Sequence, residues 1–474
     1  MLEKEYKVLA KNTVIISLGT FGSRAISFFL LPIFTRVLTK ADYGKIDFFA
    51  TTISLLLPFL TLGIVDAVFR FTMEKTGEEE KSGVLSSALM VSFWGILVFL
   101  VFVPIISKIE SISELTIYMV FAFAINSVLS IFKTYIRAKQ KLLIFALGDI
   151  IHTISFATLG IVFVVVLRYG IKGYFLGYIL SSLVDVLFLL IFGKIYKDIS
   201  LKNVSLQKIR NMLEYSIPLI PNGLSWWIMN VSDRYLIIFY LGFAANGIYS
   251  VSYKFMSLIT ILNGIFYQAW QISAVEQYKS RNKDEFYSKI FRILSTFLLL
   301  IVMVFSIVLK PIMRIMVGAS FYEAWRYVLF LFLGAIFSAF SSFFGVGYIA
   351  SKKTVGAFKT SVVGAMVNIG INIVFIPIIG AQAAAISTMM AFLAMWIMRI
   401  FETRKYFRIK NNWIKLVLSF LLVSLSLFVN FIQKIFIMYT IQIATLIVFI
   451  LINRKEIKAI LLKIKVAIIS KTGR

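Results

Sequence analysis

The chain has 474 residues, of which 60% are hydrophobic and only 15% are charged, and its mean hydropathy is +0.92. Soluble globular proteins carry about 25% charged residues, so this composition indicates an integral membrane protein. Cysteine is absent and His152 is the single histidine, which excludes a disulfide framework, a thiolate metal site and a multi-histidine metal site.

Fourteen apolar segments follow one another along the chain, each long enough to span a bilayer as a helix. In chain order they are residues 12–36, 44–66, 84–107, 114–136, 143–167, 173–193, 213–232, 246–270, 291–310, 326–350, 360–378, 381–400, 414–432 and 435–452. Most lysines and arginines lie in alternate loops on the side of both termini, so the positive-inside rule places both termini in the cytoplasm. We therefore interpret the net charge of +27 as the topology signal of a multi-pass protein of the inner or plasma membrane, with no nucleic-acid partner.

Three short motifs recur in the same order in the two halves of the chain. They are Leu38-x-x-Ala41-x-x-Gly44 with Leu241-x-x-Ala244-x-x-Gly247, Tyr135–Lys139 with Tyr348–Lys352, and Gly170-x-x-Gly173 with Gly380-x-x-Ala383. An even number of segments separates equivalent motifs, which gives both halves one orientation. The prediction is an all-α polytopic fold with two six-helix lobes related by a pseudo-twofold axis along the membrane normal. The lobes cover residues 1–205 and 206–405, followed by two helices at 406–453 and a basic amphipathic cytoplasmic tail at 454–474.

Arg24 lies in the middle of the first apolar segment. A charge at that depth costs at least about 2.5–3.5 kcal/mol, and such residues usually face a bundle interior or a water-filled cavity. Ser17 and Thr20 fall on the same helical face as Arg24. This polar stripe therefore predicts that the first helix faces something other than lipid.

Further polar faces follow in the second half of the chain. Lys254 shares a face with Gln268 and Gln271, and Asn222 shares one with Asn230 and Asp233. Asn368 and Asn372 share a face of segment 360–378. Turned inward across the interface of the lobes, these faces would line a hydrated cavity near the membrane midplane. The planar donors of Arg24 and the point charge of Lys254 suit a phosphate group, and Arg234 is a third candidate for it.

Acidic side chains allow an alternative interpretation of the predicted cations. Arg24 and Lys254 could instead form structural ion pairs with Asp149, Asp185 or Asp233. Asp149 and His152 share a helical face, which fits either a protonation-sensitive pair or a hydrogen-bonded structural histidine. Asp149, His152, Asp185 and Asp233 are therefore candidates for coupling transport to H⁺ or Na⁺, and no other cofactor is expected.

Enzymatic function is disfavoured by the motifs and by the loops. No constellation of paired carboxylates or of an activated nucleophile is recognisable on a loop, and no glycine-rich phosphate cradle precedes a Lys-Ser or Lys-Thr pair. A membrane polymerase or glycosyltransferase would be expected to carry its charged residues in a sizeable extramembrane loop, and every loop here is short. Such an enzyme stays as the less favoured alternative to a transporter.

Two regions resemble polysaccharide flippases of the Wzx type. The first is Gly22-Ser23-Arg24 with Leu31-Pro32, Thr35–Leu38 and Asp42-Tyr43-Gly44. The second is Tyr215–Asn222 with Ser232–Tyr235, Asn246–Ser250, Lys254-Phe255 and Gln268–Trp270. That family belongs to the multidrug/oligosaccharidyl-lipid/polysaccharide (MOP) exporter superfamily, whose two-lobed fold of 12 or 14 helices agrees with the repeat.

The resemblance implies movement of undecaprenyl-diphosphate-linked oligosaccharide from the inner to the outer leaflet by alternating access. It also implies that Ser23-Arg24 corresponds to a Ser-Arg pair that contacts substrate diphosphate in the related lipid II flippase. The second-lobe arginines of that relative have no counterpart here, and we infer that Lys254 replaces them. Expected partners are the lipid-linked oligosaccharide, the bilayer and other membrane proteins of polysaccharide assembly. Alternatives are a lipid II flippase and a small-molecule exporter of the same superfamily, in which Asp149 or Asp185 rather than Arg24 would be essential.

Overall fold

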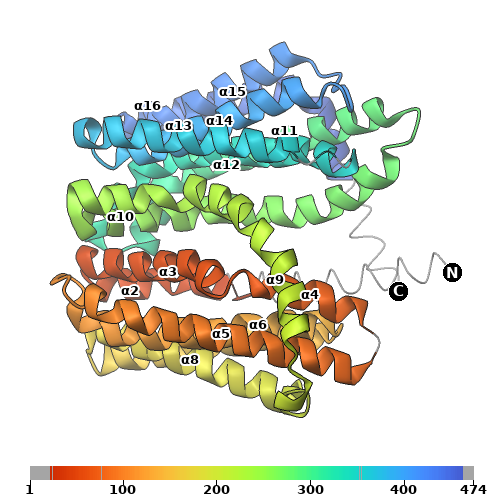
Figure 1. Ribbon diagram of the computed structural model, residues 1–474. Helices are drawn as coiled ribbons and strands as arrows, with labels where there is room; N and C mark the ends of the chain where they lie inside the picture. The colour runs from red at the N-terminus through yellow and green to blue at the C-terminus, as the bar shows by residue number, and fades with distance from the viewer. Residues whose placement is uncertain (1–21, 24, 76, 352, 354, 463–474) are drawn as a thin grey trace, which may run out of the picture. The chain divides into compact units, whose positions relative to one another are not determined.

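The computed structural model describes residues 22–23, 25–75, 77–351, 353 and 355–462, without the side chains of Leu201 and Asn222 (Figure 1). Every regular element among these residues is helical, as the composition predicts. Eleven helices are long and apolar enough to cross a membrane, or twelve if one bent pair forms a single span. The predicted number of fourteen is not confirmed, because segments seven and eight fall in one element and residues 12–21 and 24 of segment one lie outside the described residues.

The chain divides into two compact units at Trp227 and Ile228. The N-terminal unit holds α2 to α9 and the start of α10, and the C-terminal unit holds the rest. The helices are α2 (Leu31–Val37), α3 (Lys40–Leu60), α4 (Ile64–Glu74), α5 (Glu78–Ile106), α6 (Thr116–Ala138), α7 (Leu142–Ile161), α8 (Gly170–Phe192), α9 (Leu206–Ser216), α10 (Ile220–Gln277), α11 (Lys283–Met316), α12 (Trp325–Ala350), α13 (Val355–Ile379), α14 (Gln382–Thr403), α15 (Trp413–Phe428) and α16 (Ile435–Ile452). The predicted limits of the lobes, at residues 205 and 405, stay a prediction.

Helices α3 and α4 follow one another across a sharp bend, with 59° between their axes. Pro58 lies in the last turn of α3, and Leu62 and Gly63 follow with positive φ angles of 52° and 65°. The carbonyl of Leu62 accepts a hydrogen bond of 2.7 Å from the hydroxyl of Ser216 at the end of α9. A backbone group freed by the bend thus finds a partner inside the unit, which a membrane environment requires.

Helix α10 contains a reversal of the chain at Gly242. Gly242 has φ 80° and ψ 176°, a backbone conformation that is essentially restricted to glycine. The hydroxyl of Tyr249 donates a hydrogen bond to the Asp233 carboxylate, although 16 residues separate them. In a straight helix these residues would lie about 24 Å apart. The two halves of α10 therefore run side by side, and Gly242 forms a turn inside the repeated Leu241-x-x-Ala244-x-x-Gly247 motif.

The two units repeat one internal arrangement. In the N-terminal unit α8 packs on both α6 and α7, and in the C-terminal unit α14 packs on both α12 and α13. Gly170 and Gly380, which the sequence pairs as equivalent turns, both have positive φ angles, of 55° and 69°. The matching left-handed turns agree with a duplicated helix topology.

The paired Tyr135 and Tyr348 motifs make the same kind of contact. Tyr135 donates a hydrogen bond of 3.1 Å to Asp198, and Tyr348 donates one of 2.6 Å to Glu402. Lys139, beyond the end of α6, pairs with Asp198 at 2.9 Å and with Glu78 at 2.6 Å. Burial lowers the pKa of Lys139, but its hydrogen bonds to Glu78 and Asp198 outweigh this, so the pKa lies above its usual value.

Helices α15 and α16 pack on α11 and on each other. Their buried contact is polar: the Ser306 hydroxyl donates to the Ser426 carbonyl at 2.7 Å, and the Gln442 amide donates to the same carbonyl at 3.1 Å. After a break at Asn453 the chain is helical again over residues 454–462. This segment is the described part of the predicted amphipathic tail, and residues 463–474 lie outside the described residues.

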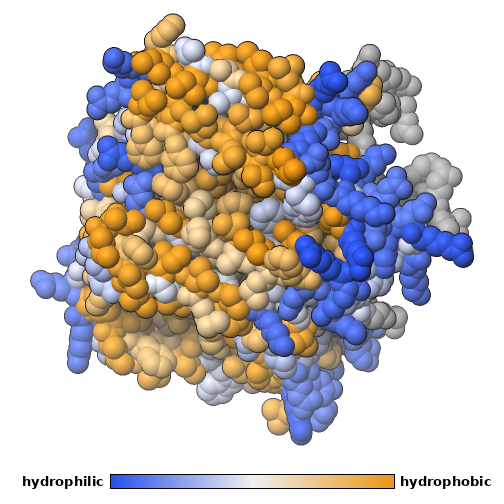
Figure 2. All heavy atoms as spheres, turned by 90° about the horizontal axis from the view of Figure 1, so that it is seen from above, coloured by the Kyte–Doolittle hydropathy of each residue, from blue (hydrophilic) through white to orange (hydrophobic). Residues whose placement is uncertain are grey.

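The surface has the pattern of a membrane protein. In Figure 2 the visible face is apolar across its middle and hydrophilic at both ends. Large apolar side chains are exposed along the spans, such as Val101, Ile414 and Phe436. Contiguous apolar surface of this extent needs a lipid environment, and helices that satisfy their own backbone hydrogen bonds are suited to it.

Candidate functional site

Three helices of the N-terminal unit bring charged side chains together in its interior. The Lys133 ammonium on α6 lies 2.6 Å from the Asp149 carboxylate on α7 and 2.9 Å from the Asp185 carboxylate on α8. Asp185 is completely buried, and the side chains of Lys133 and Asp149 are about four-fifths buried. We call Lys133, Asp149 and Asp185 the N-unit ion cluster. One cation thus faces two carboxylates, so the cluster carries an excess of negative charge.

A polar path leads from this cluster to a cavity. His152 lies one turn beyond Asp149 on α7 and is 3.2 Å from the hydroxyl of Ser182 on α8. Its ring meets the ring of Tyr178 edge-on, at 6.1 Å between centroids. Tyr178 donates a hydrogen bond of 2.9 Å to Asn126 on α6, and both residues line a cavity of about 270 Å³.

The path follows a helical spacing on each helix. Asn126 and Lys133 are seven residues apart on α6, and Tyr178, Ser182 and Asp185 follow steps of four and three on α8. Side chains at these steps share one face, so the polar faces of the helices converge. Such a chain of carboxylates, imidazole and hydroxyls can bind or pass a proton or a small cation.

Asp233 and Arg234 lie in the interior of the C-terminal unit, on the first half of α10. Asp233 is completely buried and also accepts a hydrogen bond of 3.3 Å from the hydroxyl of Thr388 on α14. The Arg234 guanidinium donates to the carbonyl of Asn230 at 2.7 Å and lies over the Tyr253 ring, 4.2 Å from its centroid. Asp233 therefore joins the two halves of α10 to α14, and Arg234 joins the two halves of α10 to each other.

Asn368 and Asn372 on α13 are both completely buried. The Asn372 amide donates to the Asn368 side-chain oxygen at 3.2 Å, which confirms that the two share a helical face. The Ser387 hydroxyl on α14 donates to Asn372 at 2.7 Å, and the Ser232 hydroxyl on α10 donates to Asn368 at 3.2 Å. The structure thus places these amides in the contact between helices and away from any exposed wall.

Lys254 lies on an exposed face of the C-terminal unit. It stands twelve residues after the Gly242 turn, which at 1.5 Å per residue is about 18 Å along the helix. With the Gly242 turn at the membrane surface, between the predicted segments 213–232 and 246–270, Lys254 would lie near the middle of a hydrocarbon core of about 30 Å. Gln268, on the same side of α10, is exposed as well, Gln271 is partly exposed, and Asn230 on the first half of α10 is half-buried.

Several predicted site residues cannot be placed. Ser17, Thr20 and Arg24 lie outside the described residues. Asn222 lies in the first turn of α10, but its side chain is not described. The predicted partnership between Arg24 and Lys254 therefore stays a prediction.

Two buried cations were not among the residues predicted from the sequence. Lys133 lies five residues before the end of α6, and Arg399 lies four residues before the end of α14. The Arg399 guanidinium, only 3% exposed, donates to the Ser341 carbonyl at 2.8 Å and to the Thr360 hydroxyl at 3.0 Å. Each cation lies within a few residues of the end of an apolar segment, where a lysine or arginine is common at the membrane surface, so neither was singled out. The seven-residue spacing from Asn126 was the available signal for Lys133.

The fold is similar to those of solved MurJ and MATE transporters. An inward closed structure of the lipid II flippase MurJ has a TM-score of 0.71 and 18% identity, over 94% of this chain and 100% of that one. An inward-facing multidrug resistance MATE transporter of the MOP superfamily has a TM-score of 0.66 and 13% identity, over 84% of this chain and 97% of that one. Identities this low establish the architecture alone.

The particular family follows from the sequence. Residues 9–271, more than half of the chain, match the model of the polysaccharide biosynthesis protein family. The chain therefore belongs to this family, in agreement with the resemblance of the two regions to polysaccharide flippases. Comparison with curated proteins gives no match.

Proposed function

We propose that the protein is a flippase that moves undecaprenyl-diphosphate-linked oligosaccharide from the inner to the outer leaflet by alternating access. Family membership and the MOP fold support transport of a component of polysaccharide biosynthesis. The observation that carries the diphosphate part of the proposal is the exposed Lys254 at the depth of the membrane midplane. An ammonium group at that depth requires water or an anion beside it, since hydrocarbon does not solvate a charge.

The predicted site residues match the chemical groups of this substrate. A diphosphate needs charge neutralisation, which Lys254 and, by its sequence position, Arg24 would provide. The oligosaccharide needs hydrogen-bonding groups for its hydroxyls, and Asn230, Gln268 and Gln271 are suited to this role. Arg234 is a less direct candidate, because the structure engages it with Asn230 and Tyr253.

Energy coupling is assigned to the N-unit ion cluster. Moving a charged headgroup in one direction needs a driving gradient, and the cluster of Lys133, Asp149 and Asp185 has more carboxylate than ammonium. Uptake of H⁺ or Na⁺ would balance this charge and alter the attraction among α6, α7 and α8. His152 and Tyr178 would connect the cluster to the nearby cavity.

We also propose that the protein lies in the plasma membrane with both termini in the cytoplasm. The positive-inside distribution of lysine and arginine supports this orientation. Lipid-linked oligosaccharide made on the cytoplasmic side would then enter from the basic side of the protein.

The proposal is tested in a host that lacks the gene and receives each variant. Lys254→Ala abolishes surface polysaccharide and leaves lipid-linked oligosaccharide accumulated, whereas Lys254→Arg keeps most export because the charge remains. Lys359→Ala is the matched control, because Lys359 is an exposed lysine near the start of α13. Full export by Lys254→Ala at normal expression would refute the role of Lys254 as a diphosphate ligand.

A small-molecule exporter is the second candidate, favoured by the N-unit ion cluster. In such a protein the carboxylates would exchange a cation for the exported compound, and Asp185→Asn would abolish transport while Lys254→Ala would not. Raised drug sensitivity of the deletion host, with normal surface polysaccharide, would establish this alternative.

A further inference from the structure

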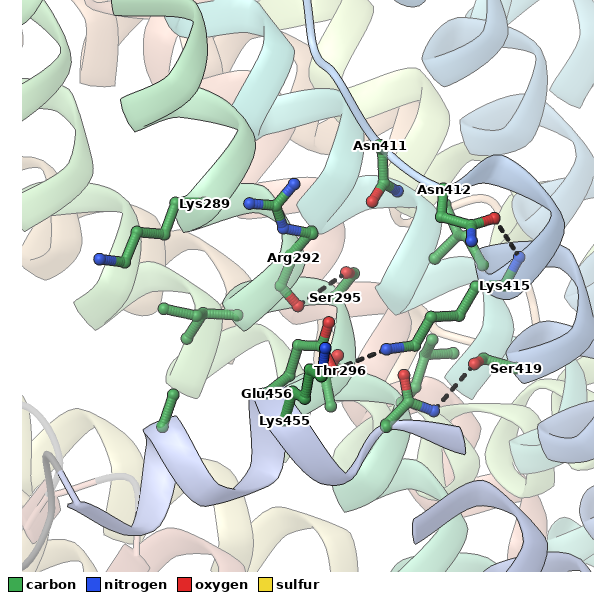
Figure 3. Close-up of a pocket in the computed structure, with 15 residues that line it drawn as sticks. Lys289, Arg292, Ser295, Thr296, Asn411, Asn412, Lys415, Ser419, Lys455 and Glu456 are labelled. Atoms are coloured by element: carbon green, nitrogen blue, oxygen red, sulfur yellow. Dashed lines mark hydrogen bonds and ion pairs between the residues drawn. The ribbon is translucent and has the colours of Figure 1, made fainter. Parts of the chain in front are cut away.

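A second polar cavity lies in the C-terminal unit, away from both Lys254 and Asp233 in sequence. It has a volume of about 460 Å³ and is formed by the start of α11, the start of α15 and the helical residues 454–462 (Figure 3). These are the ends of helices that the positive-inside rule assigns to the cytoplasmic surface. The cavity therefore lies at the level of the inner-leaflet headgroups.

The lining of this cavity is strongly basic. It holds four cations, Lys289, Arg292, Lys415 and Lys455, against a single carboxylate, Glu456. Lys415 pairs with Glu456 at 2.6 Å (Figure 3), so the carboxylate is already neutralised. Among the described residues neither Lys289 nor Lys455 forms an ion pair, and both side chains are exposed. The cavity thus has positive charge that the surrounding protein leaves uncompensated.

The geometry of the cavity is held by hydrogen bonds. The Arg292 guanidinium donates to the Lys410 carbonyl at 3.0 Å, which fixes the chain before α15 to α11. The Asn453 amide donates to the Ser419 hydroxyl at 3.0 Å, which fixes the base of segment 454–462 to α15 (Figure 3). Together with the Lys415–Glu456 pair, these bonds join all three walls. A preorganised group of ammonium, guanidinium and amide donors matches the oxygens of a phosphate.

Apolar side chains border the same cavity. Ile293, Leu299 and Leu416 contribute to its lining. On the surface nearby, Ile414 of α15 is 75% exposed and Leu461 of segment 454–462 is 60% exposed. A ligand with a phosphate and hydrocarbon chains would satisfy both kinds of surface, whereas a soluble phosphate would leave the apolar part uncovered.

We propose that this cavity binds the phosphate headgroup of an anionic phospholipid of the cytoplasmic leaflet. The basic residues hold the phosphate, and the acyl chains lie along the exposed apolar side chains of α15 and segment 454–462. The site anchors the two C-terminal helices to the inner leaflet and is separate from the transported substrate.

The test is a binding titration of purified, delipidated full-length protein by native mass spectrometry. The probes are phosphatidylglycerol and, with the same acyl chains, zwitterionic phosphatidylcholine. The double variant Lys289→Gln/Lys455→Gln removes two cations that have no ion-pair partner among the described residues. At about 1 kcal/mol for each cation near a lipid phosphate, it should bind phosphatidylglycerol about 30-fold more weakly than wild type. Phosphatidylcholine binding should stay unchanged.

The control variant Lys202→Gln/Lys279→Gln removes two exposed lysines from loops on the same side of the protein and keeps wild-type binding. Equal phosphatidylglycerol affinity of the cavity variant and this control would overturn the proposal. Displacement of phosphatidylglycerol by millimolar inorganic phosphate, with equal thermal stabilisation by phosphate alone, would also overturn it, because the cavity would then be a free-phosphate site.

Discussion

Replacing Lys133 by methionine tests the N-unit ion cluster. Methionine keeps the length of the side chain but leaves the carboxylates of Asp149 and Asp185 without the ammonium group that lies 2.6 and 2.9 Å away. Removing one partner of a buried ion pair costs about 3–5 kcal/mol, because the remaining charge is neither solvated nor neutralised. For a unit of this size, 1 kcal/mol shifts the melting temperature by roughly 2–4 °C, so we expect a decrease on the order of 10 °C.

Thermal unfolding in detergent, followed by size-exclusion fluorescence, measures this decrease. Lys172→Met is the matched control: Lys172 pairs with Glu114 at 2.7 Å, but both side chains are exposed, so no measurable shift is expected. Adding Asp149→Asn and Asp185→Asn to Lys133→Met should restore most of the lost stability, since no buried charge then remains. A melting temperature for Lys133→Met equal to that of Lys172→Met would refute the ion cluster as a buried, coupled unit.

Three further substitutions test other parts of the fold by the same thermal assay. Tyr249→Phe removes a hydroxyl that donates to the buried Asp233 and should cost about 1–3 kcal/mol; an unchanged melting temperature would contradict the assigned hydrogen bond. Gly242→Ala should lower the free energy of unfolding by about 1–3 kcal/mol, because a residue with a Cβ atom rarely adopts a φ of 80°. Gly264→Ala is its control: Gly264 is helical and a Cβ atom added there meets no atom within 4 Å, so stability should be unchanged or higher. Arg399→Lys should lower stability, because an ammonium group cannot reach the separate acceptors that the guanidinium joins; wild-type stability would show that these bonds contribute little.

Hydropathy and glycine turns could be predicted from the sequence because both are local properties. A long apolar run leaves a spanning helix as the only stable form in lipid, so the spans in the described residues were predictable. The motifs at Gly170 and Gly380 were paired from the sequence, and both glycines form turns with positive φ angles. The number of spans was harder to predict from the sequence. Helix breaks such as the one at Gly63 depend on contacts with a distant helix, here α9.

Partnerships between distant side chains could not be predicted. Asp149, His152 and Asp185 were recognised as candidates, but Lys133, close to the end of its apolar segment, was not. Its contact with Asp185 spans 52 residues and depends on how α6 meets α8. Asn368 and Asn372 were correctly given one face, while burial of that face is decided by α14. Periodicity identifies a polar face, and only packing decides what it meets.

The leaflet position of the lipid-linked oligosaccharide tests the proposed translocation most directly. In sealed spheroplasts, a membrane-impermeant periodate reagent oxidises only sugars in the outer leaflet, and mass spectrometry of extracted lipids measures the oxidised fraction. We predict that deletion of the gene leaves the lipid-linked oligosaccharide protected, that the wild-type gene restores oxidation, and that Lys254→Ala does not. An equal oxidised fraction in the deletion host and in the wild type would contradict the assignment of this protein as the flippase.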